Sequence, residues 1–543
     1  MYIHRAKRKS TSGRIHTSVL LQHSYREDGK TKHKTILNLS KWSGSEVAAL
    51  EAMLKGKRGF DINDLKTTEG KYIGGVYVFN ELAKQIGITK ALGKSKQGKL
   101  ALLLIIGRIL TQGSRRKLCY WKEEQEIESV LGISDFSTDD LYKTLDWLAE
   151  KQAKIEDKLF KMRHPETINL FLYDVTSSYL EGDENELGAW GYNRDKKRGK
   201  KQIVIGLLTD SEGVPVTVEV FKGNTKDTET MSSQIEKCTH RFGVKNITMV
   251  GDRGMIKAPQ KEVLTEEHYS YITAITKPQI NKLLTDDIIQ MSLFDNEIAE
   301  VEYQKEDKKT EESEENYNRY ILRKNPYRKK EIEDNRNQKI SAAQDYMSTL
   351  TAYLENHPKA SFEVAYKKAM AYLKKLNIAS FVVPVISTEL SNKKRIVNVF
   401  INESKKEEIR LLDGCYVLHT DLSPNTLSKE AVHQRYKDLA LVETAFRTLK
   451  MGCLEIRPIF VRKSSRTKGH VFLSMLSYML VQRLWKSTQS LNLPLSHMIE
   501  LICSIKTVVI QLGETSTARI PEITQKKKDI LKQLNIELPK TIA

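Results

Sequence analysis

The chain has 543 residues, of which 88 are Lys or Arg and 69 are Asp or Glu, and its formal net charge at pH 7 is +19. This length exceeds what one hydrophobic core serves and predicts about two to four domains. A basic surface of this strength gathers phosphate through counterion release, which favours nucleic acid as the partner; a charge that only maintains solubility is the alternative.

Five scattered cysteines without a Cys-x-x-Cys pair predict reduced thiols and argue against a zinc site. The most apolar run, Leu100 to Leu110, contains Arg108 and is far shorter than the roughly 20 residues of a membrane span. The basic amino terminus lacks the apolar segment of a secretory signal. We therefore expect a cytoplasmic protein with no membrane contact.

The first 43 residues alternate as strands do. Ile15 to His23 and Lys34 to Leu39 flank an Asp28-Gly29 pair, which predicts a β-hairpin. Its basic residues suit contact with DNA, and equally a solvated hairpin packed on a neighbouring domain.

From Ser45 to Met162 the pattern is helical, and Ser137 followed by Asp139-Asp140 predicts a helix start. Such a region, with the basic cluster Arg115 to Lys117, suits DNA binding. No single helix in it identifies itself as a recognition helix.

A mixed sheet covered by helices is predicted from Thr167 onward. The predicted strands are Ile168 to Asp174, Ile203 to Thr209, Val214 to Phe221, Ile247 to Gly251 and Tyr271 to Ile275. The first ends in Asp174 and the fourth is followed by Asp252. One such aspartate is often only a turn or cap residue, but strand ends converge at one sheet edge, so the two together indicate a site.

The region from Lys277 to about Arg410 differs in composition and predicts an inserted α+β subdomain. Lys305 to Asn318 is charged and polar, as in a solvated loop. Ser341 to Leu376 is helical, and Phe381 to Val385 with Ile396 to Ile401 predict strands. Further on, the predicted elements are an apolar helix from Val471 to Lys486, a helix from Leu495 to Ile505, a strand from Val508 to Leu512 and a helix from Thr524 to Leu534.

The stretch from Tyr436 to Lys450, YKDLALVETAFRTLK, predicts one amphipathic helix. Its apolar stripe consists of Leu439, Val442, Phe446 and Leu449, and its edge of Tyr436, Glu443, Arg447 and Lys450. A carboxylate among cations suits a place where a metal ion meets a phosphate; a surface helix with a charged flank is the alternative. Three carboxylates, Asp174, Asp252 and Glu443, around one cleft are able to hold two Mg²⁺ ions about 3.5 to 4 Å apart.

The series YDVTSSYLEG, GLLTDSEGVPVTVEVFKGNTKD, MVGDRGM and YKDLALVETAFRTLK resembles the catalytic core of bacterial and archaeal insertion-sequence DDE transposases, in the subgroup with a Tyr-Arg-Glu-Lys signature. The resemblance spans about residues 165 to 490 and implies a ribonuclease-H-like core. It implies that Asp174, Asp252 and Glu443 are the catalytic and metal-binding residues, with two Mg²⁺ ions that Mn²⁺ is able to replace. Tyr436 and Lys450 match the first and last signature positions, which contact DNA near the transposon end.

One signature position departs from the pattern. Leu439 stands where the family has an arginine, and its place beside the apolar stripe predicts core packing. Arg447 or Arg435 is a candidate to replace the missing cation. Any step that depends on the arginine is in doubt for this chain.

The resemblance implies cleavage at transposon ends and transfer of the freed 3′-hydroxyl into target DNA, with second-strand cleavage through a DNA hairpin in some members. The partners implied are double-stranded DNA, as terminal inverted repeats and target, and a second copy of the chain in a homodimeric synaptic complex. The setting is the prokaryotic cytoplasm, on the nucleoid. Two alternatives stay open: a ribonuclease-H-like nuclease without strand transfer, and a non-catalytic DNA-binding protein derived from a transposase.

Two basic segments are candidate DNA contacts, with solvated loops as the alternative. The candidates, together with Arg447, are Trp190, Tyr192, Arg194, Lys196, Lys197, Arg198, Arg462, Lys463, Arg466 and Lys468. His470 nearby suits a structural role at least as well as catalysis. In the insertion, Gln290, Met291, Ser292, Leu293 and Phe294 resemble the peptide by which bacterial replication proteins dock on the DNA sliding clamp; a buried amphipathic segment is the alternative.

The expected fold is therefore mixed α/β: a ribonuclease-H-like core interrupted by an inserted α+β subdomain. The predicted regions are an N-terminal β-hairpin region (1–43), a helical DNA-binding region (44–164), the first part of the core (165–276), the insertion (277–410), the second part of the core with the Glu443 helix (411–490) and a helical tail (491–543).

Overall fold

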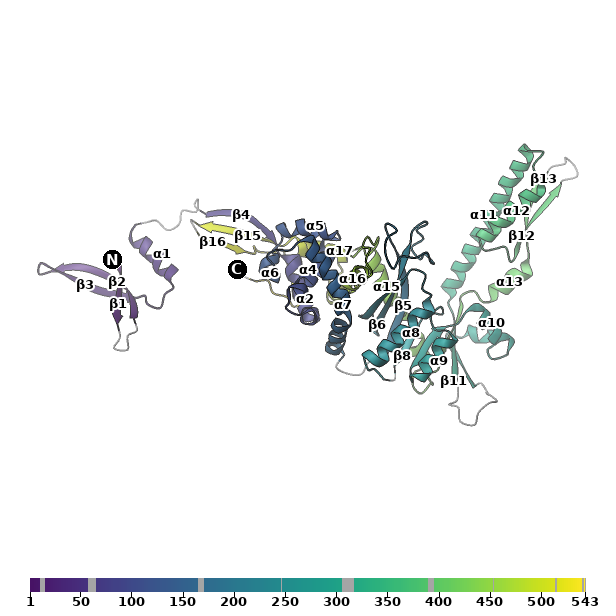
Figure 1. Cartoon of the computed structure of the whole chain (residues 1–543), viewed down its shortest axis with the longest axis horizontal. Coiled ribbons are helices and arrows are strands. Elements are labelled where there is room, and N and C mark those ends of the chain that lie inside the picture. The colour runs from purple at the N-terminus through teal and green to yellow at the C-terminus, as the bar shows by residue number, and fades with distance from the viewer. Residues whose placement is uncertain are drawn as a thin grey trace. The chain divides into compact units, whose positions relative to one another are not determined.

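The computed structural model describes residues 1–9, 15–56, 65–164, 170–245, 247–304, 317–388, 395–452, 454–512, 515–539 and 542. The chain forms two compact units (Figure 1). The first consists of Met1–Val78, Lys122–Gly132 and His497–Ala543, and the second of Phe79–Trp121 and Ile133–Ser496. Cys119, Cys238, Cys415 and Cys503 are free thiols, as predicted, and Cys453 lies outside the described residues.

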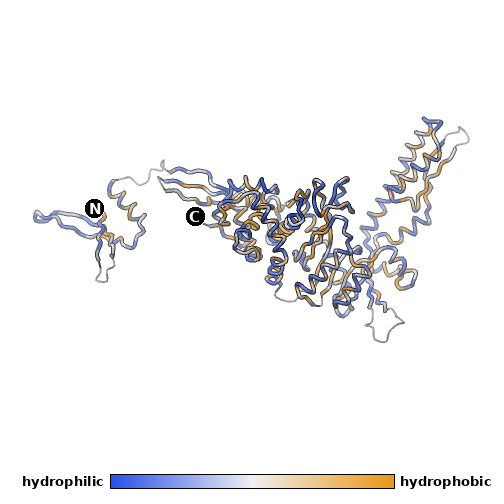
Figure 2. Tube along the Cα trace, viewed as in Figure 1, coloured by the Kyte–Doolittle hydropathy of each residue, from blue (hydrophilic) through white to orange (hydrophobic). Residues whose placement is uncertain are grey.

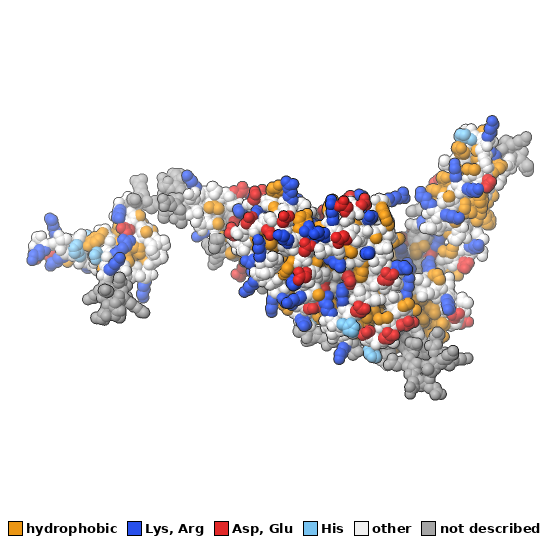
Figure 3. Space-filling view, viewed as in Figure 1, with side chains coloured by type: hydrophobic (Ala, Val, Ile, Leu, Met, Phe, Trp, Pro, Cys, Tyr) orange, Lys and Arg blue, Asp and Glu red, His pale blue; other side chains and the backbone are white. Residues whose placement is uncertain are grey.

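The amino-terminal sheet of the first unit is antiparallel, in the order β1 (Tyr2–Lys9), β2 (Ile15–Glu27) and β3 (Lys30–Asn38). The predicted hairpin is confirmed: Asp28 and Gly29 at its turn have φ values of 51° and 75°, as this tight turn requires. Strand β1 lies within the 43 residues whose alternation predicts strands, although the predicted hairpin does not include it. The sheet is largely hydrophilic, and Lys, Arg and His side chains lie over it (Figures 2 and 3).

A second sheet of the first unit joins distant parts of the chain, in the order β16 (Thr515–Arg519), β15 (Lys506–Leu512) and β4 (Leu65–Tyr72). The predicted strand in the tail is confirmed. The helical expectation for β4 is wrong, because its backbone pairs with β15 along the register from Leu65 opposite Leu512 to Tyr72 opposite Lys506. The other elements of this unit are α1 (Gly44–Leu54), η2 (Lys122–Glu124), α6 (Ile127–Leu131) and α18 (Gln525–Gln533).

Helices α2 (Gly74–Gln85) and α17 (Leu495–Cys503) each contain one of the four points where the chain passes between the units. The helical part of the second unit consists of α3 (Ile88–Leu92), α4 (Lys96–Thr111), α5 (Arg115–Trp121), α7 (Thr138–Arg163), α16 (Ser464–Thr488) and η5 (Gln489–Leu491). Helix α7 starts at the predicted Ser137, whose hydroxyl accepts from the amide of Asp140. The apolar helix α16 packs against α4 and α7.

The central sheet of the second unit has eight strands in the order β10-β11-β14-β9-β8-β5-β6-β7. Their bounds are β5 (Leu170–Tyr179), β6 (Gln202–Asp210), β7 (Pro215–Lys222), β8 (Thr248–Gly251), β9 (Ser270–Ala274), β10 (Ala299–Gln304), β11 (Tyr317–Lys324) and β14 (Cys415–Thr420). Strands β5, β6 and β7 pair antiparallel, whereas β8 and β9 continue parallel to β5. This arrangement is ribonuclease-H-like and confirms the mixed α/β fold. One detail was wrong: β5 continues through Asp174, which therefore lies within the strand and not at its end.

The insertion is partly built into the central sheet. Its strands β10 and β11 pair with each other, and β11 pairs with β14. The rest forms a core of its own, with Met347, Ala369 and Val382 among its buried residues. This part consists of α11 (Pro326–Asn356), α12 (Phe362–Lys375), β12 (Val382–Thr388), β13 (Arg395–Ile401) and α13 (Glu403–Leu411). The expected solvated loop lies, up to residue 316, outside the described residues.

Helices cover both faces of the central sheet. Tyr173 and Val175 of β5 belong to a buried cluster with Met231 of α8 (Asp227–Glu236) and Leu264 of α9 (Ala258–Glu266). Because side chains alternate along a strand, Asp174 faces the other side, where α15 (Leu439–Lys450) packs on β5 and β6. The remaining elements are η3 (Lys237–Arg241), α10 (Lys277–Thr285), η4 (Met291–Asp295) and α14 (Lys429–Lys437).

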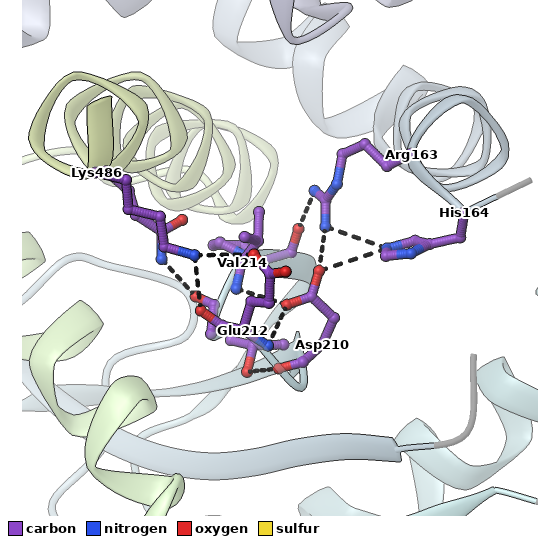
Figure 4. Close-up of polar contacts among 10 residues, drawn as sticks. Arg163, His164, Asp210, Glu212, Val214 and Lys486 are labelled. Carbon is purple, nitrogen blue, oxygen red and sulfur yellow. Dashed lines mark hydrogen bonds and ion pairs between the residues drawn. The ribbon is translucent and has the colours of Figure 1, made fainter.

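The turn between β6 and β7 is fixed by two helices (Figure 4). The carboxylate of Asp210 accepts hydrogen bonds from Arg163, at the end of α7, at 3.0 Å and from the amide of Val214 at 2.9 Å. From α16, Lys486 pairs with Glu212 at 3.2 Å. The turn is thereby held by both α7 and α16.

Candidate functional site

Strand register brings the two aspartates together. Strands β5 and β8 are parallel, and Tyr173 is the partner of Gly251 in their ladder. Asp174 and Asp252 are the next residues of each chain segment, so their backbones leave the ladder side by side. Strand β9 flanks β8 on the other side, so Asp252 follows an interior strand of the sheet and not an edge strand.

The third carboxylate comes from α15. Its apolar stripe packs on the sheet as predicted, since Leu439, Val442, Phe446 and Leu449 are all buried. Glu443 lies on the exposed side of this helix. The prediction of a single helix was wrong: α14 ends at Lys437 and α15 starts at Leu439, with Asp438 between them.

All three carboxylates line two adjoining cavities. One, of about 400 Å³, is also lined by Arg194, Asp227, Arg447 and Lys450. The other, of about 520 Å³, is also lined by Arg253, Lys277, Tyr416, Tyr436 and Lys437. We call the first the carboxylate cavity. The structure therefore brings Asp174, Asp252 and Glu443 to one place, with cations on both sides.

The charges of the three acids act on one another. Burial and, less strongly, the neighbouring charges of Asp252 and Glu443 raise the pKa of Asp174 from its usual 3.8 to about 7, against the opposing effects of Arg194 and of a hydrogen bond from the amide of Val175. A buried carboxylate beside two others gains from a bound cation, because the cation offsets both burial and repulsion.

These acids fit a hard metal ion by their chemistry, since Mg²⁺ prefers carboxylate oxygens. In the described part of the chain, no three His, Cys, Asp or Glu side chains stand close enough together to hold a metal as they are. Asp252 instead accepts hydrogen bonds from the amide of Arg253 at 2.8 Å and from the hydroxyl of Tyr436 at 3.2 Å. Rotation of the carboxylates toward the cavity would exchange such bonds for metal ligation.

Two predicted DNA contacts are engaged within the protein. Tyr436 donates to Asp252, and burial together with that carboxylate raises the pKa of its phenol well above the usual value. Lys450 pairs at 2.8 Å with Asp195, whose side chain is only 2% exposed. Asp195 also accepts from Arg457 and, at 3.2 Å, from the amide of Tyr179. It thus ties the end of α15 to the end of β5.

Asp195 and Asp227 were missed at the sequence level. Asp195 is the one acid within the basic run Arg194 to Lys201. A lone acid among cations is the sequence signal that could have identified it. Asp227 accepts two hydrogen bonds of 2.7 Å from Arg194, so Arg194 faces the carboxylate cavity and not the solvent.

The other candidate DNA contacts are mostly on the surface. Trp190 is 61% exposed and Tyr192 is 81% exposed. The exposed cations are Lys196, Lys197, Arg198, Lys463 and Lys468, together with Arg462, which pairs with Glu184 at 2.5 Å. Arg466 pairs with Asp146 at 3.2 Å. His470 is buried and hydrogen bonded to Arg115 at 2.8 Å, which favours the structural role.

The two candidates for the missing signature arginine differ in position. Arg447 lines the carboxylate cavity. Arg435 lies on α14 and pairs with Asp438 at 3.4 Å. Leu439 is buried, as predicted, and contributes no charge.

The peptide resembling a clamp-docking motif is part of the protein's core. Phe294 is 1% exposed and belongs to a cluster with Ile289, Leu322 and Val417. Leu293 packs against the same cluster, whereas Gln290 and Ser292 are exposed. The two residues that would fill the clamp's pocket are therefore already packed.

Comparisons with known proteins agree on one family. The sequence model of the transposase DDE domain matches residues 165–480, and that of the IS1634 family transposase N-terminal domain matches residues 3–63. Comparison with curated protein sequences finds no match. No helix in the described residues has the length and apolarity that crossing a bilayer requires.

Two solved transposase structures show distant similarity. A piggyBac transposase synaptic complex with hairpin DNA is 8% identical, with a TM-score of 0.37, over 74% of this chain and 69% of that chain. The Mos1 transposase paired-end complex with left transposon end is 11% identical, with a TM-score of 0.15, over 33% of this chain and 58% of that chain. The family assignment rests on the sequence models and not on these values.

Proposed function

The chain belongs to the family of transposases with a DDE domain, and from that premise we propose that Asp174, Asp252 and Glu443 are its catalytic carboxylates. As a member, the chain is a DNA transposase, an enzyme that cleaves DNA at transposon ends and joins the ends to a target. The observation that carries the residue assignment is the register of β5 and β8, which sets Asp174 beside Asp252 in a cavity that Glu443 also lines.

Transposases of this family use divalent metal ions, and we propose Mg²⁺ held by these three side chains, as two ions that Mn²⁺ is able to replace. When bound, such ions activate an attacking oxygen and stabilise the leaving oxygen of a phosphodiester. The chain's own residues orient the carboxylates and bind the scissile phosphate. Tyr436 holds Asp252 by a hydrogen bond, Arg194 offsets the charge of Asp174, and Arg447 offers a cation to the scissile phosphate from the same cavity wall.

We further propose that Arg447 replaces the cation missing at Leu439, since it lines the carboxylate cavity and Arg435 does not. The exposed residues of the 190–198 loop and of the 462–468 segment are proposed as contacts with the DNA backbone. Two transposon ends have to be held together for joining, so we propose that the synaptic complex contains two copies of the chain. Light scattering measures the mass of this protein–DNA complex and thereby tests the number of copies.

The assignment predicts that Asp174→Asn, Asp252→Asn and Glu443→Gln each abolish cleavage of a transposon-end duplex in Mg²⁺ while binding to that duplex is unchanged. The substitutions keep the size of each side chain and remove the charge that a metal requires. Cleavage is measured on denaturing gels and binding by fluorescence anisotropy. Full cleavage by any one variant removes that residue from the assignment.

A matched control is Asp183→Asn, which changes an acid outside both cavities and should cleave as the wild type does. Strand transfer with pre-cut ends separates the two remaining alternatives. A nuclease without joining activity would cleave the duplex and leave pre-cut ends unjoined, and a non-catalytic DNA-binding protein would do neither.

A further inference from the structure

A third cavity lies among the helices of the second unit, at the loop after α4 and the start of α16, and has a volume of about 450 Å³. Its wall contains six cationic side chains, those of Arg108, Arg115, Arg457, Arg462, Lys463 and Arg466. Among the described residues that line this wall, Glu455 is the only acid. We call this cavity the cationic pocket. The single carboxylate of the lining leaves most of the positive charge of the six cations unbalanced.

Three of the six cations have acidic partners outside the lining. Arg462 pairs with Glu184, Arg466 with Asp146 and Arg457 with Asp195. Among the described ion pairs none involves Arg108, Arg115 or Lys463. Within the described part of the chain, the positive charges of Arg115 and Lys463 therefore remain in or at the pocket without an ion pair, and that of Arg108 is opposed only by Glu455 on the same wall.

Two of these unpaired cations are deeply set. Arg108 donates to the backbone carbonyls of Leu454 and Glu455, which anchor it without neutralising it. Arg115 donates to Nδ1 of His470 at 2.8 Å. Burial and the two arginines lower the pKa of His470 well below its usual value, so the imidazole is neutral and accepts this hydrogen bond.

Arg108 and Arg115 are half-buried cations without a described ion pair. Such an arrangement is unfavourable, because removing a charge from water has a cost that a partner charge offsets. Burial lowers the pKa of Arg115. Burial and the charge of Arg115 together lower the pKa of Arg108 to about 10, against the opposing charge of Glu455. A bound anion between the two guanidinium groups would remove this repulsion. The fork geometry of arginine suits a phosphate oxygen pair in particular.

An ion-pair relay connects the cationic pocket to the carboxylate cavity. Arg457 lines the first and Lys450 lines the second. Both pair with the buried carboxylate of Asp195. Asp195 thus links Arg457, which lines the cationic pocket, to Lys450 at the end of α15, the helix that carries Glu443.

We propose that the cationic pocket binds a phosphate group of the DNA on which this protein acts. The identity of the ligand as DNA rests on the proposed function, whereas the preference for phosphate rests on the pocket itself. The volume accommodates a phosphate with its sugar, and Phe460, 71% exposed, adds an apolar surface at the lining for the nucleotide. Free inorganic phosphate shares the same chemistry and serves as a second probe.

The test compares Arg115→Gln and Lys463→Gln with Arg483→Gln in the full chain. Arg483 is an exposed cation on α16 that lies outside the pocket. Binding of a fluorescent 30-bp duplex is measured between 50 and 200 mM KCl, about the range over which phosphate contacts dominate. Each pocket variant should weaken binding about tenfold and reduce the slope of log K against log salt by about one, and the control should do neither.

Wild-type affinity and slope in both pocket variants would overturn the proposal. Lys463 is exposed at the start of α16, so Lys463→Gln answers the question even where Arg115→Gln fails to fold. Inorganic phosphate supplies the second readout: it should raise the melting temperature of the wild type and of Arg483→Gln, and not that of Lys463→Gln. An equal rise in the melting temperatures of the wild type, Arg483→Gln and Lys463→Gln would show an adventitious ion only. That result would likewise overturn the proposal that the cationic pocket binds phosphate.

These arms also separate the two proposals. Failure of the wild type to bind any duplex would contradict the proposed function, and the phosphate readout would still decide the pocket. Loss of cleavage in Asp174→Asn with an unchanged salt slope would leave both proposals intact.

Discussion

The ionised form of Asp174 is destabilised, because this carboxylate is largely removed from water and lies near the charges of Asp252 and Glu443. Its pKa of about 7 lies above the usual 3.8, so the folded state holds a proton that the unfolded chain releases. Stability from this group is therefore full below about pH 4 and is lost as the pH rises toward 7. The proposed metal ligand is the ionised form of Asp174, which is the form that burial destabilises.

The pH dependence is directly measurable. Asp174→Asn cannot ionise, so its melting temperature should exceed that of the wild type by a few degrees at pH 8 in EDTA and match it near pH 4. Circular dichroism in the two buffers gives both values. Mg²⁺ at pH 8 should raise the melting temperature of the wild type and leave the variant unchanged. Parallel pH curves for the two proteins would contradict the burial of this charge.

At the scale of elements, the position of Glu443 depends on what α15 rests against. Gly213, in the turn between β6 and β7, has a φ of 73°, and a Cβ there would lie 2.6 Å from the Cβ of Leu441 on α15. Gln482 of α16 donates to the carbonyl of Gly213 at 2.9 Å. The turn shown in Figure 4 therefore supports α15 as well as joining two strands.

Gly213→Val should lower the cleavage rate by about 100-fold, because displacing α15 by about 1 Å misplaces Glu443. Gly243→Val is the matched control: Gly243 also has a positive φ, 62°, and nothing lies within 4 Å of its added Cβ. Both variants carry the backbone strain of roughly 1 to 2 kcal/mol, so equal rates would show that contact with Leu441 is unimportant. Rates are compared in single-turnover cleavage of the end duplex.

At the scale of the whole molecule, segments far apart in the chain share each structural layer. The central sheet joins strands from residue 170 to residue 420 and takes two of them, β10 and β11, from the insertion. The core beside these strands contains Phe294, the residue that resembled a clamp-docking anchor. The insertion is thus part of the framework of the second unit.

From this packing we expect the full chain not to bind a DNA sliding clamp in a pull-down. Docking would require Phe294 to leave a core in which its ring is 1% exposed, and deleting such a ring costs about 3 to 5 kcal/mol. Phe294→Ala should accordingly lower the free energy of unfolding by that amount. Retention of the clamp by the wild type, lost in Leu293→Ala without loss of stability, would reverse this interpretation.

The succession of the first five strands of the central sheet along the chain, the positions of Asp174 and Asp252 at or next to two of them, and the amphipathic stripe of α15 follow from the sequence alone. Period-2 alternation, turn residues such as Asp28-Gly29 and the series of motifs are local properties, and a linear reading captures them. Leu439 was likewise assigned to the core from its helical position, and it is buried.

Only the tertiary structure decided how charges pair and where distant strands join. Lys450 and Arg457 meet the same carboxylate of Asp195, and β4 becomes a strand because β15, more than 400 residues later, supplies its hydrogen bonds. The cationic pocket gathers Arg108 and Arg457 from segments that no spacing rule connects. Such pairings depend on long-range packing, because Coulombic and ladder interactions act through space and leave no periodic trace in the chain.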